Sequence, residues 1–250
     1  MSIMQNKNVE SIIIIASGGL DSTTLIWKAI SEKIKIKEIL SFNYGQKHSR
    51  EIENIKSILL YLKKKGQNIN HRVVDITTIS DLISKGALTG EEELPKEMYD
   101  RESQRVTIVP NRNMILLSIA AGRGVVLEAS HVAYAAHASD HEVYPDCRPE
   151  FIESLSSSLK LGNLWTPIEL YAPFQNLSKT DLVKLGLELN VPFELTWSCY
   201  EGNVRPCLEC GTCLERTEAF YKNNFKDLAL SDSEWEQALI LYEKHNSINK

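Results

Sequence analysis

The fold is decided by the stretch Ile12-Ile13-Ile14-Ile15-Ala16-Ser17-Gly18-Gly19-Leu20-Asp21-Ser22-Thr23. Its first part is short, continuous and β-branched, which is typical of a central parallel strand that is covered on both faces. Apolar residues then recur at helical spacing, at positions 25, 26, 29 and 30, so the glycine pair stands at a strand-to-helix turn. The stretch therefore predicts the first strand and helix of a parallel α/β sheet.

The glycine turn also predicts an anion site. Glycines let backbone N–H groups approach a ligand closely, and a helix N-terminus presents donors that have no partner inside the helix. The hydroxyl groups of Ser17, Ser22 and Thr23 add further donors, so a phosphate or pyrophosphate is the natural ligand. No Gly-Lys-Ser/Thr follows, so the turn is not a Walker A motif. The alternative interpretation is a tight turn that only starts a helix.

Length and composition are those of a soluble globular protein. The 250 residues suit one large domain with a small appendage. The net charge of −5 gives no global attraction to nucleic acid or to an anionic membrane. We expect a cytoplasmic protein that has no membrane-spanning run and does not bind nucleic acid directly. The five cysteines favour metal ligation in a reducing compartment over a disulfide framework.

Four further segments have the pattern of strands. They are residues 37–44, 71–76, 130–137 and 167–172, with helical patterns between them. This alternation predicts a doubly wound, parallel five-stranded sheet with helices on both faces. We expect residues 77–109 to form a loop, and Gly122 and Gly124 to weaken the helix that begins near Arg112.

Polar residues gather where these strands are expected to end, which is the edge where doubly wound sheets bind ligands. Gln46 and His48 follow the second strand and are placed to face a nucleotide, with a solvated loop as the alternative. Arg112 and Lys179 each lie in the first turn of a helix, where a cation gains nothing from the helix dipole. Their placement indicates an anionic ligand, and plain surface cations are the alternative.

The segment after the fourth strand is dense in reactive side chains. Two histidines, two aspartates, a tyrosine and an arginine lie within a dozen residues and predict a polar substrate pocket. The site residues predicted here are His137, Asp140, Tyr144, Asp146 and Arg148.

Four cysteines have the spacing Cys199-x7-Cys207-x2-Cys210-x2-Cys213. Thiolates at this spacing, among glycine and proline turns, suit a closed tetrahedral site for a structural zinc ion. An iron–sulfur cluster is the alternative, although the spacing departs from the ferredoxin patterns. Ser231 and Glu234 then cap a last amphipathic helix, which is suited to packing or to a dimer face. We expect a nucleotide-binding α/β domain over residues 1–195 and a zinc-binding helical lobe over residues 196–250.

Five motifs follow one another along the chain: Ser-Gly-Gly-Leu-Asp-Ser, Asn-Tyr-Gly-Gln-Lys-His, Val-Pro-Asn-Arg-Asn-Met, His-Ala-Ser-Asp-His-Glu-Val-Tyr-Pro-Asp-Cys-Arg and Thr-Trp-Ser-Cys-Tyr. The first resembles the PP-loop of the ATP pyrophosphatase superfamily, whose fold is adenine nucleotide alpha hydrolase-like. All five together, from about residue 12 to residue 220, resemble the 7-cyano-7-deazaguanine synthase family.

The family resemblance implies a two-stage reaction on 7-carboxy-7-deazaguanine. ATP adenylates the carboxylate, ammonia displaces AMP to give an amide, and a second ATP activates the amide oxygen so that loss of AMP leaves a nitrile. The product feeds queuosine or archaeosine synthesis. The resemblance also implies Mg²⁺, a structural Zn²⁺ and a homodimer.

The resemblance further implies roles for the residues named above. It places ATP against Ser17, Gly18, Gly19, Leu20, Asp21, Ser22, Thr23, Gln46, His48, Arg112 and Lys179. Asp21 would be the magnesium ligand, Arg112 and Lys179 would neutralise the adenylate, and Asp140 completes the catalytic set. The deazaguanine would lie among His137, Asp140, Tyr144, Asp146 and Arg148. The adenylation route does not require a nucleophilic Cys147.

Two residues depart from the family pattern. Ala135 stands where a glycine is expected, and Leu208 replaces a glycine after the second cysteine of the cluster. Relatives in antiphage operons are thought to use the same activation to attach the deazaguanine to a protein amine, which gives one alternative. A non-catalytic regulator that only binds nucleotide is the second alternative.

Overall fold

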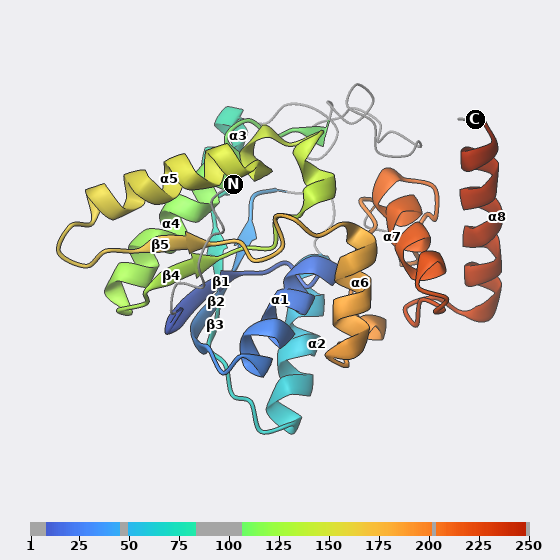
Figure 1. Cartoon of the computed structure of the whole chain (residues 1–250), viewed down its shortest axis with the longest axis horizontal. Coiled ribbons are helices and arrows are strands. Elements are labelled where there is room, and N and C mark those ends of the chain that lie inside the picture. The colour runs from blue at the N-terminus through green and yellow to red at the C-terminus, as the bar shows by residue number, and fades with distance from the viewer. Residues whose placement is uncertain (1–8, 46–49, 84–106, 202–203, 249–250) are drawn as a thin grey trace.

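The computed structural model describes residues 9–45, 50–83, 107–201 and 204–248 (Figure 1). Within them, five parallel strands form one sheet in the order β3-β2-β1-β4-β5. The strands are β1 (Ser11–Ile15), β2 (Lys35–Asn43), β3 (His71–Asp75), β4 (His131–Ala133) and β5 (Glu169–Tyr171). The predicted parallel sheet is therefore confirmed, with the first strand at its centre.

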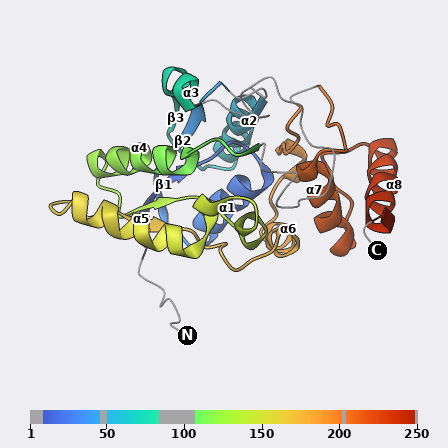
Figure 2. The same ribbon diagram turned by 90° about the horizontal axis from the view of Figure 1, so that it is seen from above.

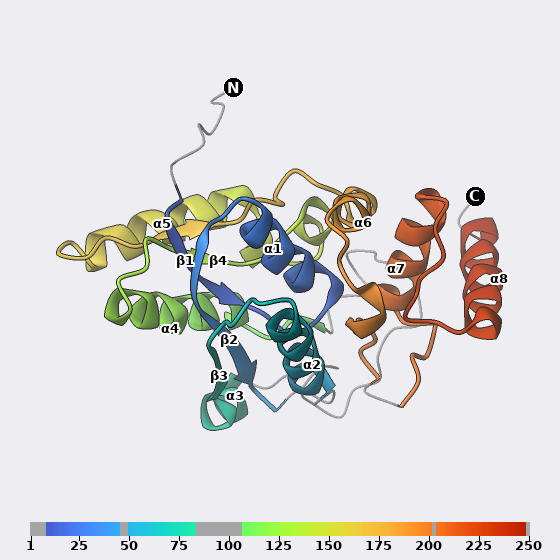
Figure 3. The ribbon, with the colours of Figure 1, turned by 90° about the horizontal axis from the view of Figure 1, so that it is seen from below.

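Helices cover both faces of this sheet, as a doubly wound fold requires. Figures 1, 2 and 3 show α1, α2 and α6 on one face and α4 and α5 on the other, with α7 and α8 side by side beyond α6. The helices are α1 (Leu20–Ser31), α2 (Arg50–Lys64), α3 (Thr77–Ile83), α4 (Arg112–Val126), α5 (Pro149–Gly162), α6 (Lys179–Glu188), α7 (Gly211–Lys222) and α8 (Asp232–Ile248).

The central strand explains the two-layered core. Ile12, Ile13 and Ile14 have no exposed surface. Because successive side chains of a strand point to opposite faces, Ile12 and Ile14 pack with α1, α2 and α6, whereas Ile13 packs with α4 and α5. Burial on both faces is the reason that this strand is a continuous isoleucine run.

Two expectations from the sequence are corrected. Helix α4 continues through Gly122 and Gly124 to Val126. A Cβ atom at Gly124 would lie 2.3 Å from Cδ1 of Ile168, so this glycine allows α4 to pack closely and does not end the helix. Thr77–Ile83 is helical although we expected a loop from residue 77, and residues 84–106 of that loop lie outside the described residues.

The fourth and fifth strands are shorter than predicted. Strand β4 ends at Ala133, although the pattern predicted residues 130–137, and β5 ends at Tyr171, although it predicted residues 167–172. After β4 the chain forms two short 3-10 turns, Ala138–His141 and Pro145–Cys147, and the predicted substrate residues lie within these turns or directly beside them. These residues therefore stand at the carboxyl edge of the sheet. Across the described helices, none combines the length and apolar character needed to cross a bilayer.

Candidate active site

The glycine turn between β1 and α1 leaves the start of the helix open. Gly18 has a φ of +78°, and a Cβ atom there would lie 2.6 Å from the backbone nitrogen of Ile55 in α2. The amide of Gly19 donates to Ser17 Oγ at 3.4 Å, and no side chain caps α1. An uncapped helix N-terminus beside a compact glycine turn is a site for an anion.

The other residues of the turn have different surroundings. The Ser22 hydroxyl donates to the carbonyl of Gly19 at 3.4 Å and accepts from the amide of Ser17 at 3.3 Å. Leu20 is buried in the core. Thr23 has no exposed surface, and its hydroxyl has no partner among the described residues. Ser22 and Thr23 therefore face inward, whereas Ser17 and Gly19 are partly exposed.

A cluster of charged side chains lies next to this turn. The ammonium Nζ of Lys179, the first residue of α6, is 2.8 Å from both carboxylate oxygens of Asp21. The ring nitrogen Nε2 of His137 is 3.7 Å from Asp21 and 3.5 Å from Asp140. Residues from α1, α6 and the segment after β4 thus meet at one place.

Burial and charge act against each other in this cluster. Burial alone would raise the pKa of Asp21, but Lys179 and His137 outweigh it and hold the pKa well below the usual range. Burial would lower the pKa of Lys179 and that of His137, yet the neighbouring carboxylates raise both pKa values. Each charge is therefore stabilised by its partners and depends on their staying in place.

A further member of the cluster, Glu215, was missed by the sequence reasoning. Its Oε2 atom is 3.5 Å from Nζ of Lys179, and the residue is buried within α7. Burial raises the pKa of Glu215, and Lys179 opposes this effect. In the sequence, Glu215 is one of several charged residues after Cys213, and no spacing connects it to a lysine on another helix.

The charge cluster, defined as Asp21, His137, Asp140, Lys179 and Glu215, has more acidic than basic members. Three carboxylates face one ammonium and one imidazole, so an added cation would be favoured. Among the described residues, only the four cysteines bring three or more ligand atoms close enough together to hold a metal ion without a further ligand. Mg²⁺ is usually bound by one or two carboxylates together with phosphates, so Asp21 beside an anion site fits such an ion.

Arg112 stands at a second cluster, which is aromatic. Its guanidinium carbon lies 5.9 Å from the ring centre of Tyr44 and 6.0 Å from that of Tyr144. The Tyr144 hydroxyl is 2.8 Å from Oγ1 of Thr107 and 3.4 Å from the hydroxyl of Tyr200. Burial raises the pKa of Tyr44 to about 12. The cluster presents aromatic faces and one cation at the start of α4.

The remaining predicted substrate residues make bonds within the protein. Asp146 accepts from the backbone and side-chain nitrogens of Asn113, both at 3.2 Å, and so anchors the start of α4. Arg148 donates through Nε to the carbonyl of His141 at 2.7 Å. Cys147 is buried, and burial raises the pKa of its thiol, which keeps it protonated. Gln46 and His48 lie outside the described residues.

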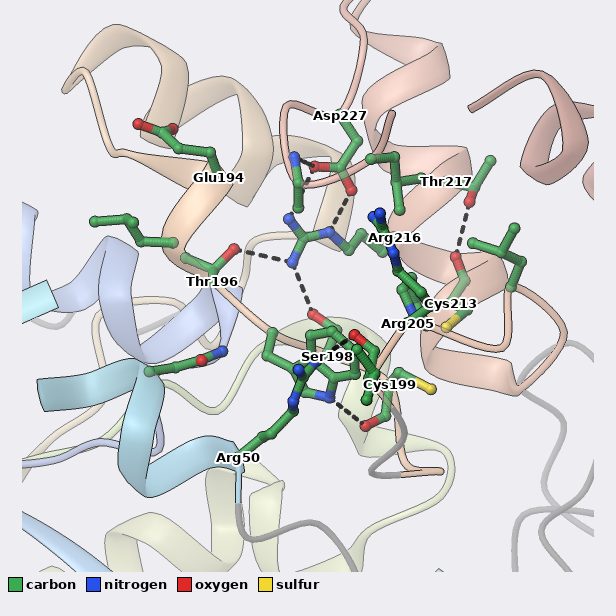
Figure 4. Close-up of a pocket in the computed structure, with 18 of the residues that line it drawn as sticks. Arg50, Glu194, Thr196, Ser198, Cys199, Arg205, Cys213, Arg216, Thr217 and Asp227 are labelled. Atoms are coloured by element: carbon green, nitrogen blue, oxygen red, sulfur yellow. Dashed lines mark hydrogen bonds and ion pairs between the residues drawn. The ribbon is translucent and has the colours of Figure 1, made fainter. Parts of the chain in front are cut away.

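A pocket of about 350 Å³ lies between α2 and segments within residues 194–199, 204–208 and 213–230 (Figure 4). Arg216 reaches into it and is held by Asp227 at 2.5 Å and by Thr196 Oγ1 at 2.9 Å. The guanidinium of Arg50 lies 4.7 Å from the ring centre of Trp197. None of the charge-cluster residues lines this pocket.

The four cysteines of the predicted metal site lie together. Their sulfur atoms are all within 4.8 Å of one another, and Sγ of Cys199 is 3.6 Å from that of Cys207. Zinc–sulfur bonds of about 2.3 Å in a tetrahedron place sulfurs about 3.8 Å apart, so the arrangement fits one metal ion. Backbone amides of Cys207 and Cys210 donate to cluster sulfurs at 3.3 Å, which suits thiolates.

The structure also accounts for one departure from the family pattern. Leu208 has a φ of +65°, a left-handed conformation that favours glycine. Its side chain is buried against Leu230 and Ala238, so apolar burial offsets the backbone strain. Ala135 is partly buried against the core, and its backbone is not left-handed.

Comparisons with known proteins relate the chain to one family. The family model for "Queuosine biosynthesis protein QueC" matches residues 11–224. A 7-cyano-7-deazaguanine synthase of Archaeoglobus fulgidus is 55% identical over 95% of this chain and 97% of that protein. One from Pseudoalteromonas atlantica is 42% identical over 88% of this chain and 97% of its own. A solved 4-thiouridine synthetase in complex with RNA and ATP has a TM-score of 0.48 and 17% identity, covering 95% of this chain and 52% of the other.

Proposed function

The chain belongs to the QueC family of queuosine biosynthesis proteins, and from this premise we propose that it converts 7-carboxy-7-deazaguanine to 7-cyano-7-deazaguanine. The relatives named 7-cyano-7-deazaguanine synthase align along nearly all of this chain. The enzyme would be an ATP-dependent, adenylate-forming C–N ligase that uses ammonia as its nucleophile.

The reaction has two activations. In the first, a carboxylate oxygen of the substrate attacks the α-phosphorus of ATP, and pyrophosphate leaves. Ammonia then adds to the activated carbon and AMP departs with that oxygen, which gives the amide. In the second, the amide oxygen attacks the α-phosphorus of another ATP and pyrophosphate leaves; loss of AMP and of both protons from the nitrogen then gives the nitrile. Each activation releases one pyrophosphate and one AMP.

The observation that carries the proposal is the Asp21–Lys179 pair beside the uncapped start of α1. The amides at this helix end and the Ser17-Gly18-Gly19 turn would bind the pyrophosphate. Asp21 would hold Mg²⁺, which neutralises phosphate charge as the α–β bond breaks. Lys179 would stabilise the charge that develops on the same oxygens.

The aromatic cluster would bind the flat deazaguanine ring. Tyr144 and Tyr44 offer ring faces, and Arg112 supplies a cation for the adenylate. Asp140, beside His137, would accept from the guanine-like N–H edge. Asp146 would act indirectly, by fixing Asn113 at the start of α4. Arg148, whose Nε donates to the carbonyl of His141, would bind the substrate carboxylate.

The cysteine site would hold a structural zinc ion, because four cysteine ligands leave no position for a reactant. We retain the proposed parts 1–195 and 196–250, although α7 of the second part contributes Glu215 to the charge cluster. We further propose a cytoplasmic homodimer in which the exposed side of α8, including Ile240, contributes to the interface. Direct nucleic-acid binding is no part of the proposal.

Mass spectrometry tests the proposed activity. The full chain is incubated with ATP, Mg²⁺, 7-carboxy-7-deazaguanine and ammonium, and we expect free nitrile with two AMP for each molecule formed. A mass increase on an added protein, with no free nitrile, would identify a conjugating enzyme instead. ATP binding without AMP or pyrophosphate would identify a nucleotide-binding regulator.

A further inference from the structure

Glu215 lies where α7 meets the pair formed by Asp21 and Lys179 (Figure 1 shows α7 beside α6). The ammonium of Lys179 stands between two carboxylates, at 2.8 Å from Asp21 and 3.5 Å from Glu215. The side chains of Lys179 and Glu215 are 13% and 12% exposed, whereas that of Asp21 is 29% exposed. Glu215 is therefore the inner partner of the lysine and Asp21 is the outer one.

Under the proposed function, Lys179 and Mg²⁺ compete for the carboxylate of Asp21. Both of its oxygens are within hydrogen-bond distance of Lys179, yet Mg²⁺ with a bound nucleotide would draw at least one of them away. An ammonium with little exposed surface loses stability when its only anion leaves. A second anion near Lys179 would remove this penalty.

Asp140 is less suited to be that second anion. Its carboxylate accepts from the backbone nitrogen of His137 at 3.2 Å and also lies 3.5 Å from the His137 ring. Among the described residues, Asp21 and Glu215 are the two carboxylates that form ion pairs with Lys179. Glu215 is thus the group placed to receive the ammonium.

We propose that Glu215 is a positioning residue that takes up the Lys179 ammonium when magnesium-bound nucleotide draws Asp21 away. This inference rests on the proposed function, because that function supplies the ligand of Asp21. Glu215 lowers the cost of releasing Asp21 and keeps Lys179 beside the phosphates. Without it, Mg²⁺ must compete with Lys179 for the same carboxylate.

The first test measures ATP binding by the full chain at increasing Mg²⁺ concentration. We expect Glu215→Gln to raise the Mg²⁺ concentration for half-maximal binding at least fivefold, because the amide has no charge to offer Lys179. Glu215→Asp, which keeps the charge one methylene further away, should give a smaller rise. Metal content is measured for each variant, since Glu215 follows Cys213 by two residues.

Glu218 provides the matched control on the same helix. It pairs with Lys222 at 2.7 Å and accepts from the hydroxyl of Tyr242 at 3.2 Å, away from the charge cluster. Glu218→Gln should leave the Mg²⁺ requirement within twofold of wild type. An equal rise in Glu218→Gln and Glu215→Gln would overturn the proposal, because the effect would then come from general loosening of α7.

A second test needs no nucleotide. Glu215→Gln is combined with Lys179→Met, and the melting temperature is measured for both single variants and the double variant. We expect Glu215→Gln to lower the melting temperature when Lys179 is present and to raise it when Lys179 is absent, because a buried carboxylate is then left without its cation. The same shift in both backgrounds would overturn the proposal.

The outcomes separate this inference from the proposed function. If the wild type binds no ATP at any Mg²⁺ concentration, the proposed function fails and the nucleotide-linked role of Glu215 fails with it. If the wild type binds ATP and Glu215→Gln behaves like the wild type, only the role of Glu215 fails. If Glu215→Gln does not fold, Glu215→Asp carries the Mg²⁺ test, and a Mg²⁺ requirement equal to that of the wild type would then overturn the role of Glu215.

Discussion

The cysteine cluster and the charge cluster are built in opposite ways. The cysteines come from one stretch, residues 199–213, and their spacing alone describes the site. The charge cluster joins α1, the segment after β4, α6 and α7, so its members meet only because the strands are arranged in one order. A local site can be recognised before the fold is known, whereas an assembled site requires the fold.

The largest expected effect is the loss of metal and of local structure when one ligand of the cysteine cluster is replaced. Cys210→Ser should lose the bound metal and unfold the segment that the metal holds, since a structural zinc ion contributes on the order of 10 kcal/mol in small zinc domains. Metal analysis and hydrogen exchange of residues 199–213 measure this. Cys147→Ser is the matched control and should keep full metal content, because Cys147 lies near Asn113 in the 3-10 turn that precedes α5, away from the cysteine cluster. Iron in place of zinc would show that the cluster belongs to another metal class.

The next largest expected effect is a loss of catalytic rate when Lys179 of the charge cluster is replaced. Lys179→Met should lower kcat/KM for substrate-dependent pyrophosphate release by about 10²- to 10³-fold, as expected when one donor to developing charge is removed. Lys184→Met, on the exposed side of the same helix, should retain near-normal activity. Similar rates in both variants would show that Lys179 does not act on the reacting phosphates.

The pH dependence of stability gives a third, smaller effect. The pKa of Asp21 is lower in the folded chain than its unfolded value of about 4. The sign follows from linkage: this carboxylate stabilises the fold above pH 4, and the contribution is lost as the pH falls through the folded pKa. Urea unfolding at pH 7 and at pH 3 should therefore show that the difference between wild type and Asp21→Asn shrinks in acid. A constant difference would mean that the ion pair with Lys179 does not form in solution.

The smallest effect tests the packing that brings the strands together. Gly124→Ala should destabilise the chain by about 1–3 kcal/mol, because the new methyl group would meet Ile168. Gly122→Ala, on the same helix with open space around it, should be neutral or stabilising by up to about 1 kcal/mol. Urea unfolding of the two variants measures the contrast, and equal midpoints would contradict the close approach of α4.

The sequence was sufficient to predict the sheet and to name several of the charged residues that meet at its edge. The isoleucine run of β1 reveals a strand buried on both faces, and residues that follow strand ends, such as Asp21 and His137, meet at the carboxyl edge of the sheet. Gly124 misled the prediction because a glycine that ends a helix and a glycine that permits close packing look alike without the neighbouring Ile168.

Glu215 and Leu208 show what sequence reasoning lacked. Glu215 can be recognised as a member of the charge cluster only from its ion pair with Lys179, which is 36 positions away and on another helix. Leu208 was recognised as a departure from the family, but only the backbone shows that it adopts a left-handed conformation while its side chain is buried. Both properties depend on tertiary contacts that no local pattern contains.

Adenylation of the substrate carboxylate is tested most directly with an oxygen label. The full chain is given ATP, Mg²⁺, ammonium and 7-carboxy-7-deazaguanine that carries ¹⁸O in both carboxylate oxygens, and the AMP is weighed. Because each departing AMP takes one substrate oxygen, we predict that all AMP formed with the nitrile carries ¹⁸O, two labelled molecules for each nitrile. Unlabelled AMP would contradict the adenylation mechanism.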